Sequence, residues 1–164
     1  MNTVKSTLEI LAFKMLNRNV NTVWINWAVE MLIAGHNSES LLYLAGENEK
    51  TSQFELQELA HRTLNELALD YSNHEKVIKD YVCYLLDKAI LKERDHISVL
   101  ETLKNLCIEL DYDSSLYDFY SLYYAWTDLK YAEDQWYWDN ATKLNIDQII
   151  EDYFNKRKGE CLIV

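Results

Sequence analysis

Residues 72–91 decide the fold class, and they read SNHEKVIKDYVCYLLDKAIL. The first four residues form a capping box, in which Ser72 and Glu75 satisfy the exposed backbone donors of a helix start. Apolar side chains then recur every three or four residues, the spacing of one helix face. They are Val77, Ile78, Tyr81, Val82, Leu85, Leu86 and Ala89. The segment therefore predicts an amphipathic helix that ends near Leu91.

The same helical periodicity extends outward through most of the chain. Helix starts are indicated by Asn21 or Thr22, Ser38, the capping box Ser52–Glu55, Asp95, Ser114 or Ser115, and Asn145. Gly35 and Gly46 are typical helix stops. The other predicted helices span about 3–17, 21–35, 38–46, 52–69, 95–110, 114–130 and 145–154. For residues 131–144 we expect a short helix followed by a loop.

The chain has no proline and only three glycines. Turns and sheet edges commonly recruit these residues, so their scarcity disfavours a β-sandwich or an α/β fold. We expect an all-α protein of about eight short helices arranged as antiparallel α-hairpins, either an irregular bundle or a short HEAT-like solenoid. A length of 164 residues predicts one domain over residues 1–164, with 155–164 as a frayed tail.

Charge and cysteine content narrow the possible partners and the compartment. The formal net charge of −11 disfavours nucleic acids and anionic membranes, whose binding depends on lysine and arginine, although acidity can also serve solubility alone. The N-terminal residues lack the basic and apolar regions of a signal peptide. The three cysteines have no CxxC spacing and predict reduced thiols. We therefore expect a cytoplasmic protein that binds a basic protein partner.

Residues 112–138 form the most unusual segment, which we call the aromatic–acidic segment. It holds eleven of the chain's 21 aromatic residues. Seven acids lie within it or at its edges, against the single base Lys130: Asp111, Asp113, Asp118, Asp128, Glu133, Asp134 and Asp139. Tyrosine and tryptophan dominate interface hot spots, and acids steer cationic partners. A protein-binding surface competes here with two alternatives, a plain helical core and a ligand pocket.

Helical spacing separates these side chains into inward and outward sets. The residues expected to face mostly inward are Leu116, Phe119, Tyr120, Tyr123, Trp126 and Tyr131. The residues predicted to contact the partner are Asp113, Tyr117, Tyr124, Asp128, Glu133, Asp134, Trp136, Trp138 and Asp139. Among the aromatic residues, Tyr117, Tyr124, Trp136 and Trp138 are predicted to be exposed.

One pattern could carry metal chemistry. Glu58–His61 and Glu93–His96 both read E-x-x-H, and Glu30 and Glu75 could supply the further carboxylates of a di-metal bundle. However, Glu93–His96 falls in a predicted connection between helices, which cannot present a fixed face. No nucleophile motif or phosphate-binding loop is present. We therefore expect no metal, no cofactor and no enzymatic activity.

Two stretches carry a resemblance to other proteins. Residues 27–35 read WAVEMLIAG and lead into 38–47, and residues 118–129 read DFYSLYYAWTDL and lead into QWYW at 135–138. Together they resemble small all-helical bacterial proteins, some of which look like the immunity partners encoded beside secreted toxins. The resemblance implies an immunity protein that neutralises a cognate, basic, nuclease-type toxin. The alternatives are a helical interaction scaffold or a helical metalloenzyme that uses the E-x-x-H pairs.

Overall fold

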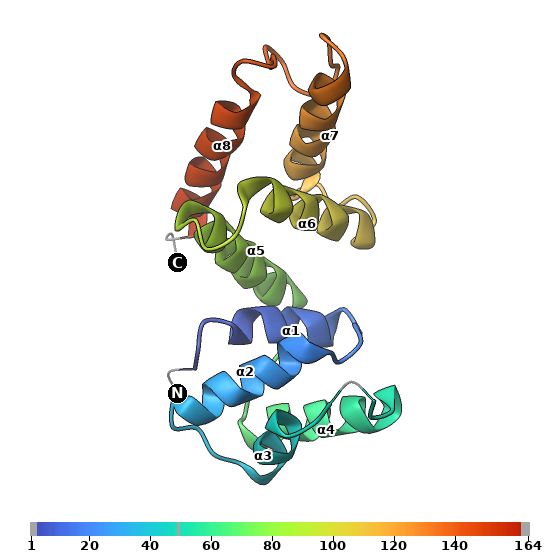
Figure 1. The fold of residues 1–164 in the computed structure, drawn as a ribbon, viewed down its shortest axis with the longest axis vertical. Helices are drawn as coiled ribbons and strands as arrows, with labels where there is room; N and C mark the ends of the chain where they lie inside the picture. The colour runs from blue at the N-terminus through green and yellow to red at the C-terminus, as the bar shows by residue number, and fades with distance from the viewer. Residues whose placement is uncertain (1–2, 49, 162–164) are drawn as a thin grey trace. The chain divides into compact units, whose positions relative to one another are not determined.

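The computed structural model describes residues 3–48 and 50–161 (Figure 1). These residues form eight helices and no strand, which confirms the predicted all-α class. The helices are α1 (Thr7–Met15), α2 (Thr22–Ile33), α3 (Glu39–Ala45), α4 (Gln53–Glu66), α5 (His74–Ile90), α6 (His96–Glu109), α7 (Tyr117–Tyr131) and α8 (Ile146–Cys161). No helix in the described part of the chain is long and apolar enough to cross a membrane.

The chain divides into two compact units, Met1–Tyr84 and Leu85–Val164, and the single domain stays a prediction. In the first unit α3 packs against both α2 and α4, and α1 packs against α2. Its core holds Trp24 and Trp27, and the Trp27 indole N–H donates to the Thr7 hydroxyl at 3.0 Å. This bond satisfies a buried donor that would otherwise destabilise the core.

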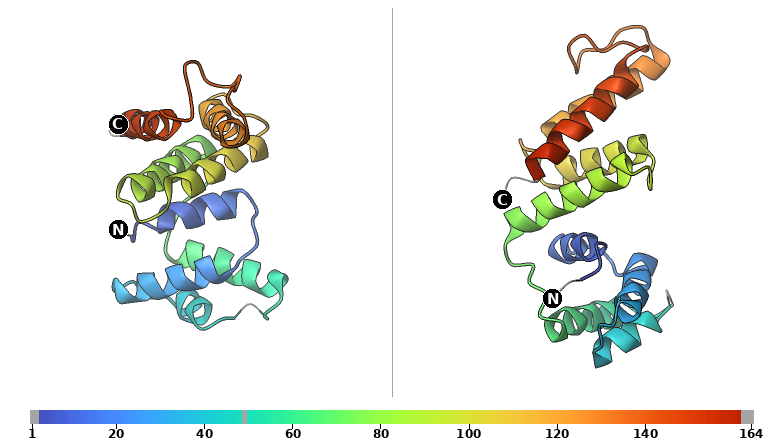
Figure 2. Two further views of the ribbon diagram at one scale, coloured as in Figure 1. Left: turned by 45° about the horizontal axis from the view of Figure 1, so that its top comes forward. Right: turned by 90° about the vertical axis from the view of Figure 1, so that its left-hand side faces the viewer.

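The second unit consists of the C-terminal part of α5 together with α6, α7 and α8. Helix α7 packs against α6 and α8, and it lies beside α8 in Figures 1 and 2. A connection of residues 132–145 joins α7 to α8. The buried side of α7 carries Phe119, Leu122, Ala125 and Leu129, spaced three or four residues apart. This spacing fixes which side of α7 remains outside.

Several predicted helix starts are confirmed by side-chain caps. Asn21, Ser38, Ser52 and Asp95 each accept a hydrogen bond from a backbone N–H in the first turn of the following helix. The capping of α5 differs from the prediction, because Asn73 rather than Ser72 accepts from the first turn, from Lys76 N at 3.1 Å.

The start of α5 is shifted because Ser72 is engaged elsewhere: its backbone N–H and its hydroxyl both bond to the Asp70 carboxylate. Two other differences concern the second unit. Residues 132–145 contain no helix, so the short helix predicted there is wrong. Helix α8 continues through Cys161 where the sequence predicts a frayed tail, and residues 162–164 lie outside the described residues.

Five helices end with a residue at positive φ: Asn17, Gly35, Ala68, Lys92 and Asp111, after α1, α2, α4, α5 and α6. In each case the next N–H bonds back to a carbonyl five residues earlier, as Leu69 N does to Leu64 O at 2.9 Å. This is the Schellman arrangement, which satisfies carbonyls left free at a helix end. Only Gly35 is glycine. Asn17 and Asp111 are residue types that tolerate this conformation, whereas Ala68 and Lys92 carry backbone strain there.

The cysteines differ from the predicted set of free thiols. Cys83 and Cys161 are each disulfide-bonded, and Cys107 is free and fully buried. The prediction of reduced thiols is therefore wrong for two of the three. The spacing of residues along the sequence holds no signal for disulfide pairing, which is why the bonding was missed.

Candidate partner-binding surface

A row of contacting tyrosine rings lies along the side of α7 that is not buried. We call Tyr112, Tyr117, Tyr120, Tyr124 and Tyr137 the tyrosine ladder. The ring centroids of Tyr117 and Tyr120 are 5.3 Å apart with a 23° interplanar angle, and those of Tyr120 and Tyr124 are 4.7 Å apart. The ring centroid of Tyr112 lies 5.6 Å from that of Tyr120, and the centroid of Tyr137 lies 5.5 Å from that of Tyr124. The ladder thus joins three parts of the chain.

Helical geometry explains the central part of the ladder. Residues 117, 120 and 124 are spaced by three and four, so their side chains share one face of α7. Tyr117 is exposed, whereas Tyr120 and Tyr124 are half-buried by neighbouring rings. Burial in this cluster raises the pKa of the Tyr120 hydroxyl, and the nearby hydroxyls of the other ladder tyrosines raise it further. The Tyr120 hydroxyl therefore remains neutral at physiological pH.

The Tyr112 end of the ladder depends on an unusual backbone. Asp111 and Tyr112 have φ values of 55° and 60°. A bulky residue in the left-handed region is a genuine outlier, and such strain persists only where surrounding contacts enforce it. Here the Tyr112 N–H bonds to Cys107 O at 2.8 Å, and its ring packs against Tyr120. This turn carries the chain from α6 to α7 and places a fifth ring on the ladder.

The connection between α7 and α8 is organised by one side chain, Gln135. Its Oε1 accepts from the backbone N–H groups of Tyr137 and Trp138, both at 2.8 Å. Its Nε2 donates to the carbonyl oxygens of Trp138 and Ala141. These four bonds hold the turn that contains Trp136, whose side chain is 94% exposed. Trp136 is therefore an exposed tryptophan on an ordered turn, and tryptophan is a residue type enriched at interface hot spots.

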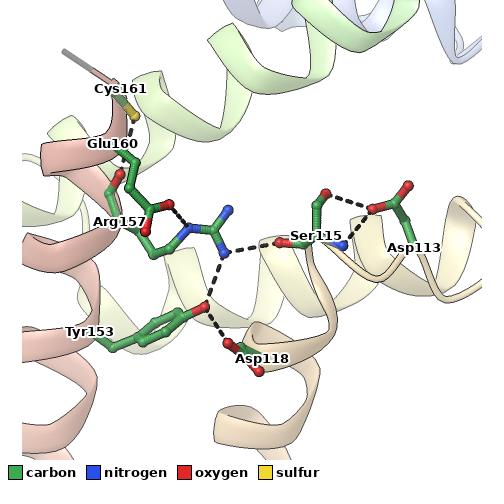
Figure 3. Close-up of polar contacts among 7 residues, drawn as sticks. All are labelled: Asp113, Ser115, Asp118, Tyr153, Arg157, Glu160 and Cys161. Carbon is green, nitrogen blue, oxygen red and sulfur yellow. Dashed lines mark hydrogen bonds and ion pairs between the residues drawn. The ribbon is translucent and has the colours of Figure 1, made fainter. Parts of the chain in front are cut away.

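Trp138 instead faces α8, where its ring meets Tyr153 edge-on with centroids 5.5 Å apart. Figure 3 shows the polar contacts of Tyr153: its hydroxyl donates to Asp118 at 2.8 Å and accepts from Arg157 at 3.0 Å. Arg157 also donates to the carbonyl of Ser115 at 2.9 Å. Burial raises the pKa of Tyr153 to about 12, with the Asp118 carboxylate adding to the rise. This network fixes α8 against the start of α7.

The acids of the aromatic–acidic segment divide into engaged and free carboxylates. Asp113 accepts from the backbone N–H and hydroxyl of Ser115, at 2.8 and 2.6 Å. Glu133 forms an ion pair with Lys143. Asp134 and Asp139 are exposed on the connection, and Asp128 is half-buried on α7. The surface thus keeps a negative field, which the single base Lys130 reduces only slightly.

The predicted partner-contacting residues are placed as follows. Asp113, Tyr117, Glu133, Asp134, Trp136 and Asp139 are exposed, and Tyr124, Asp128 and Trp138 are half-buried. Two expected inward residues are misplaced. Tyr120 belongs to the ladder on the unburied side of α7, and Tyr131 lies at the end of α7 with its side chain 79% exposed. Sequence reasoning missed Tyr112, Tyr120 and Tyr137 as ladder members and Gln135 as the organiser of the turn. The spacing of residues 117, 120 and 124 is the signal that could have found Tyr120.

Two of the residues named for metal chemistry have other partners. Glu93 forms an ion pair with Lys88 at 2.6 Å, and His61 lies 3.1 Å from the Asn65 amide. The described residues contain no group of three or more histidine, cysteine or acidic side chains that could hold a metal ion. The E-x-x-H pairs thus add no candidate site.

No family model, curated protein or solved structure matches the chain.

Proposed function

We propose that the protein is an immunity protein that binds and neutralises a cognate, basic, nuclease-type toxin domain. The observation that carries the proposal is a partly exposed tyrosine ladder, which contacts through Tyr137 the ordered turn that presents Trp136. Seven acids and one base accompany these rings in residues 111–139. This combination suits a cationic protein surface better than a nucleic acid or an anionic membrane.

In the proposed complex the acidic side chains and the aromatic rings have different roles. The free carboxylates of Asp134 and Asp139 attract the partner, which raises the association rate at low salt. Trp136 and the ladder then anchor the complex, because aromatic rings bury a large area at a small entropy cost. In a nuclease the basic residues that hold substrate phosphates would be paired with these acids instead. Neutralisation follows from covering that substrate-binding surface.

The proposed place of action is the cytoplasm, where an immunity protein meets an incoming or newly made toxin. Reducing conditions there would open the disulfide bonding of Cys83 and Cys161. Neither cysteine belongs to the ladder or to the Gln135 turn. Binding is therefore expected to be the same with these cysteines disulfide-bonded or reduced.

The test is capture of the partner from the native host, followed by an activity assay. The tagged protein is expected to recover a basic toxin domain in equal molar amount, released by high salt. Added back in equal molar amount, the protein should suppress the nuclease activity of that domain. Recovery of an acidic protein, or of a toxin that remains active in the complex, would refute the proposal. Phe54 lies in the first unit and is 82% exposed. If the Phe54→Ala variant no longer captured the partner, the scaffold alternative would be favoured instead.

A further inference from the structure

Among the described residues, no lysine or arginine side chain lies over a ring of the tyrosine ladder. Cation–ring contacts elsewhere in the described residues involve the rings of Phe13, Phe119, Tyr123, Trp126, Tyr131 and Tyr153. Two of them show how guanidinium groups pack in this protein: Arg18 lies 4.9 Å above Phe13, and Arg157 lies 4.9 Å from the centroid of Phe119. The ladder presents the same aromatic chemistry to an outside partner.

Acidic residues are near Tyr112 and Tyr137, the two terminal rings of the ladder, in the sequence. Asp111 and Asp113 are exposed and flank Tyr112 in the sequence, while Asp134 and Asp139 are exposed on either side of Tyr137. These acids lie within three residues of Tyr112 or Tyr137 in the sequence, so they add negative charge near both terminal rings of the ladder. This arrangement favours a row of several positive charges over a single one.

The spacing of the rings fits a regular ligand. Successive centroids from Tyr112 through Tyr120 and Tyr124 to Tyr137 are 5.6, 4.7 and 5.5 Å apart. Side chains at positions i, i+3 and i+4 of an α-helix begin about 5–6 Å apart. A helix laid along the ladder can thus place one long basic side chain on each step.

We infer that the tyrosine ladder binds an α-helix of the partner that carries arginines on one face. The inference rests on the proposed function and adds the chemistry of the bound segment. Arginine is preferred to lysine because its planar guanidinium stacks on aromatic faces and is more weakly hydrated than an ammonium group. The flanking carboxylates accept hydrogen bonds from its remaining N–H groups.

The test uses three capped, alanine-rich helical peptides with a fluorescent label, titrated with the full chain. The first has four arginines at i, i+4, i+7 and i+11, the second has lysines at those positions, and the third has four arginines dispersed around the helix. We expect the first peptide to bind at least about fivefold more tightly than either other peptide, since only it combines stacking with a matched spacing. Equal affinity for the first and second peptides would overturn the inference.

Variants of the ladder separate stacking from loss of structure. Tyr124→Phe keeps the ring and should bind the one-face arginine peptide within about twofold of the wild type, whereas Tyr124→Leu should lower the affinity at least about fivefold. Phe54→Leu is the matched control, with an exposed ring in the other unit and no expected effect. Thermal unfolding of each variant checks the fold. Equal binding by Tyr124→Leu and Phe54→Leu would contradict the ladder as the peptide site.

The two proposals fail in different ways. If a basic toxin is captured and inhibited but the peptides are not distinguished, the arginine helix is wrong and the immunity function stands. If the one-face arginine peptide binds the ladder selectively but no toxin is recovered, the inference stands for a different partner and the immunity function fails.

Discussion

The rings of Tyr120 and Tyr124 lie 4.7 Å apart on adjacent turns of α7, on the side opposite the buried Leu122 and Ala125. Helix α7 therefore uses its apolar residues for the core and its tyrosines for a surface. Tyrosine suits both water and a protein partner, because its ring is apolar and its hydroxyl is polar. The ladder is thus compatible with a free, monomeric chain and with a bound one.

Charge reversal on the surface should slow binding more than it weakens the fold. Replacing Asp128, Asp134 and Asp139 by lysine removes the negative field that draws a cationic partner toward the ladder. We expect the association rate to fall by about tenfold or more at low salt, with the difference shrinking at high salt. Stopped-flow binding at two ionic strengths measures this. An unchanged rate with a folded variant would contradict the electrostatic part of the account.

Gln135→Leu should loosen the turn that presents Trp136. The variant loses four hydrogen bonds at once, and the backbone N–H groups of Tyr137 and Trp138 lose their acceptor. Amide hydrogen exchange should become faster at these two residues, while the core of α7 stays protected. Gln148→Leu is the matched control, since the described bond of the Gln148 amide runs to Asp152 on the exposed side of α8. Unchanged exchange in the turn would show that Gln135 does not hold it.

The raised pKa of Tyr153 predicts that the folded protein loses stability in alkali. Its pKa is raised to about 12 in the folded protein, against about 10 in an unfolded chain, so the folded state holds the proton more tightly. The stabilisation is complete below pH 10 and is lost as the pH rises through 12. It amounts to at most about 2 kcal/mol, because solvent near the network screens the charge.

Tyr153→Phe isolates that contribution. At pH 8 the variant should lose about 1–2 kcal/mol of unfolding free energy, since the hydroxyl bonds to Asp118 and Arg157 are removed. The gap between variant and wild type should then narrow between pH 10 and 12. Urea unfolding at several pH values measures both effects. Parallel stability curves up to pH 12 would show that the hydroxyl does not titrate as described.

Ala68→Gly should stabilise the first unit. Ala68 ends α4 with φ at 51°, where an alanine side chain is strained, and its side chain is exposed. Removing that strain should add about 1 kcal/mol to the free energy of unfolding. Ala34→Gly is the control, because Ala34 has φ at −73° and is not strained. Glycine there only raises the conformational entropy of the unfolded chain, which slightly destabilises the fold. Thermal unfolding should therefore move upward for the first variant and slightly downward for the second.

Much of the fold follows from the sequence because helix signals are local. Ser52 and Asp95 cap the helices that their positions predict, and Gly35 adopts the left-handed conformation expected after α2. The Gln135 turn could not be predicted, because its order comes from one amide that bridges residues 135–141 rather than from a repeating pattern. The division of the aromatic rings between core and surface was predictable only in part. Tyr131 shows why: its position late in α7 decides its exposure, and sequence periodicity does not mark where packing against α8 ends.

The most direct measurement is the affinity of the captured partner for two variants, Trp136→Ala and Phe54→Ala, by calorimetry. Both remove a ring that is more than 80% exposed, Trp136 from the proposed binding surface and Phe54 from the other unit. The account predicts that Trp136→Ala weakens binding by at least about tenfold, the cost of a hot-spot tryptophan, and that Phe54→Ala leaves the affinity within about twofold. Equal effects of the two substitutions, or no effect of Trp136→Ala, would contradict the claim that this surface holds the partner.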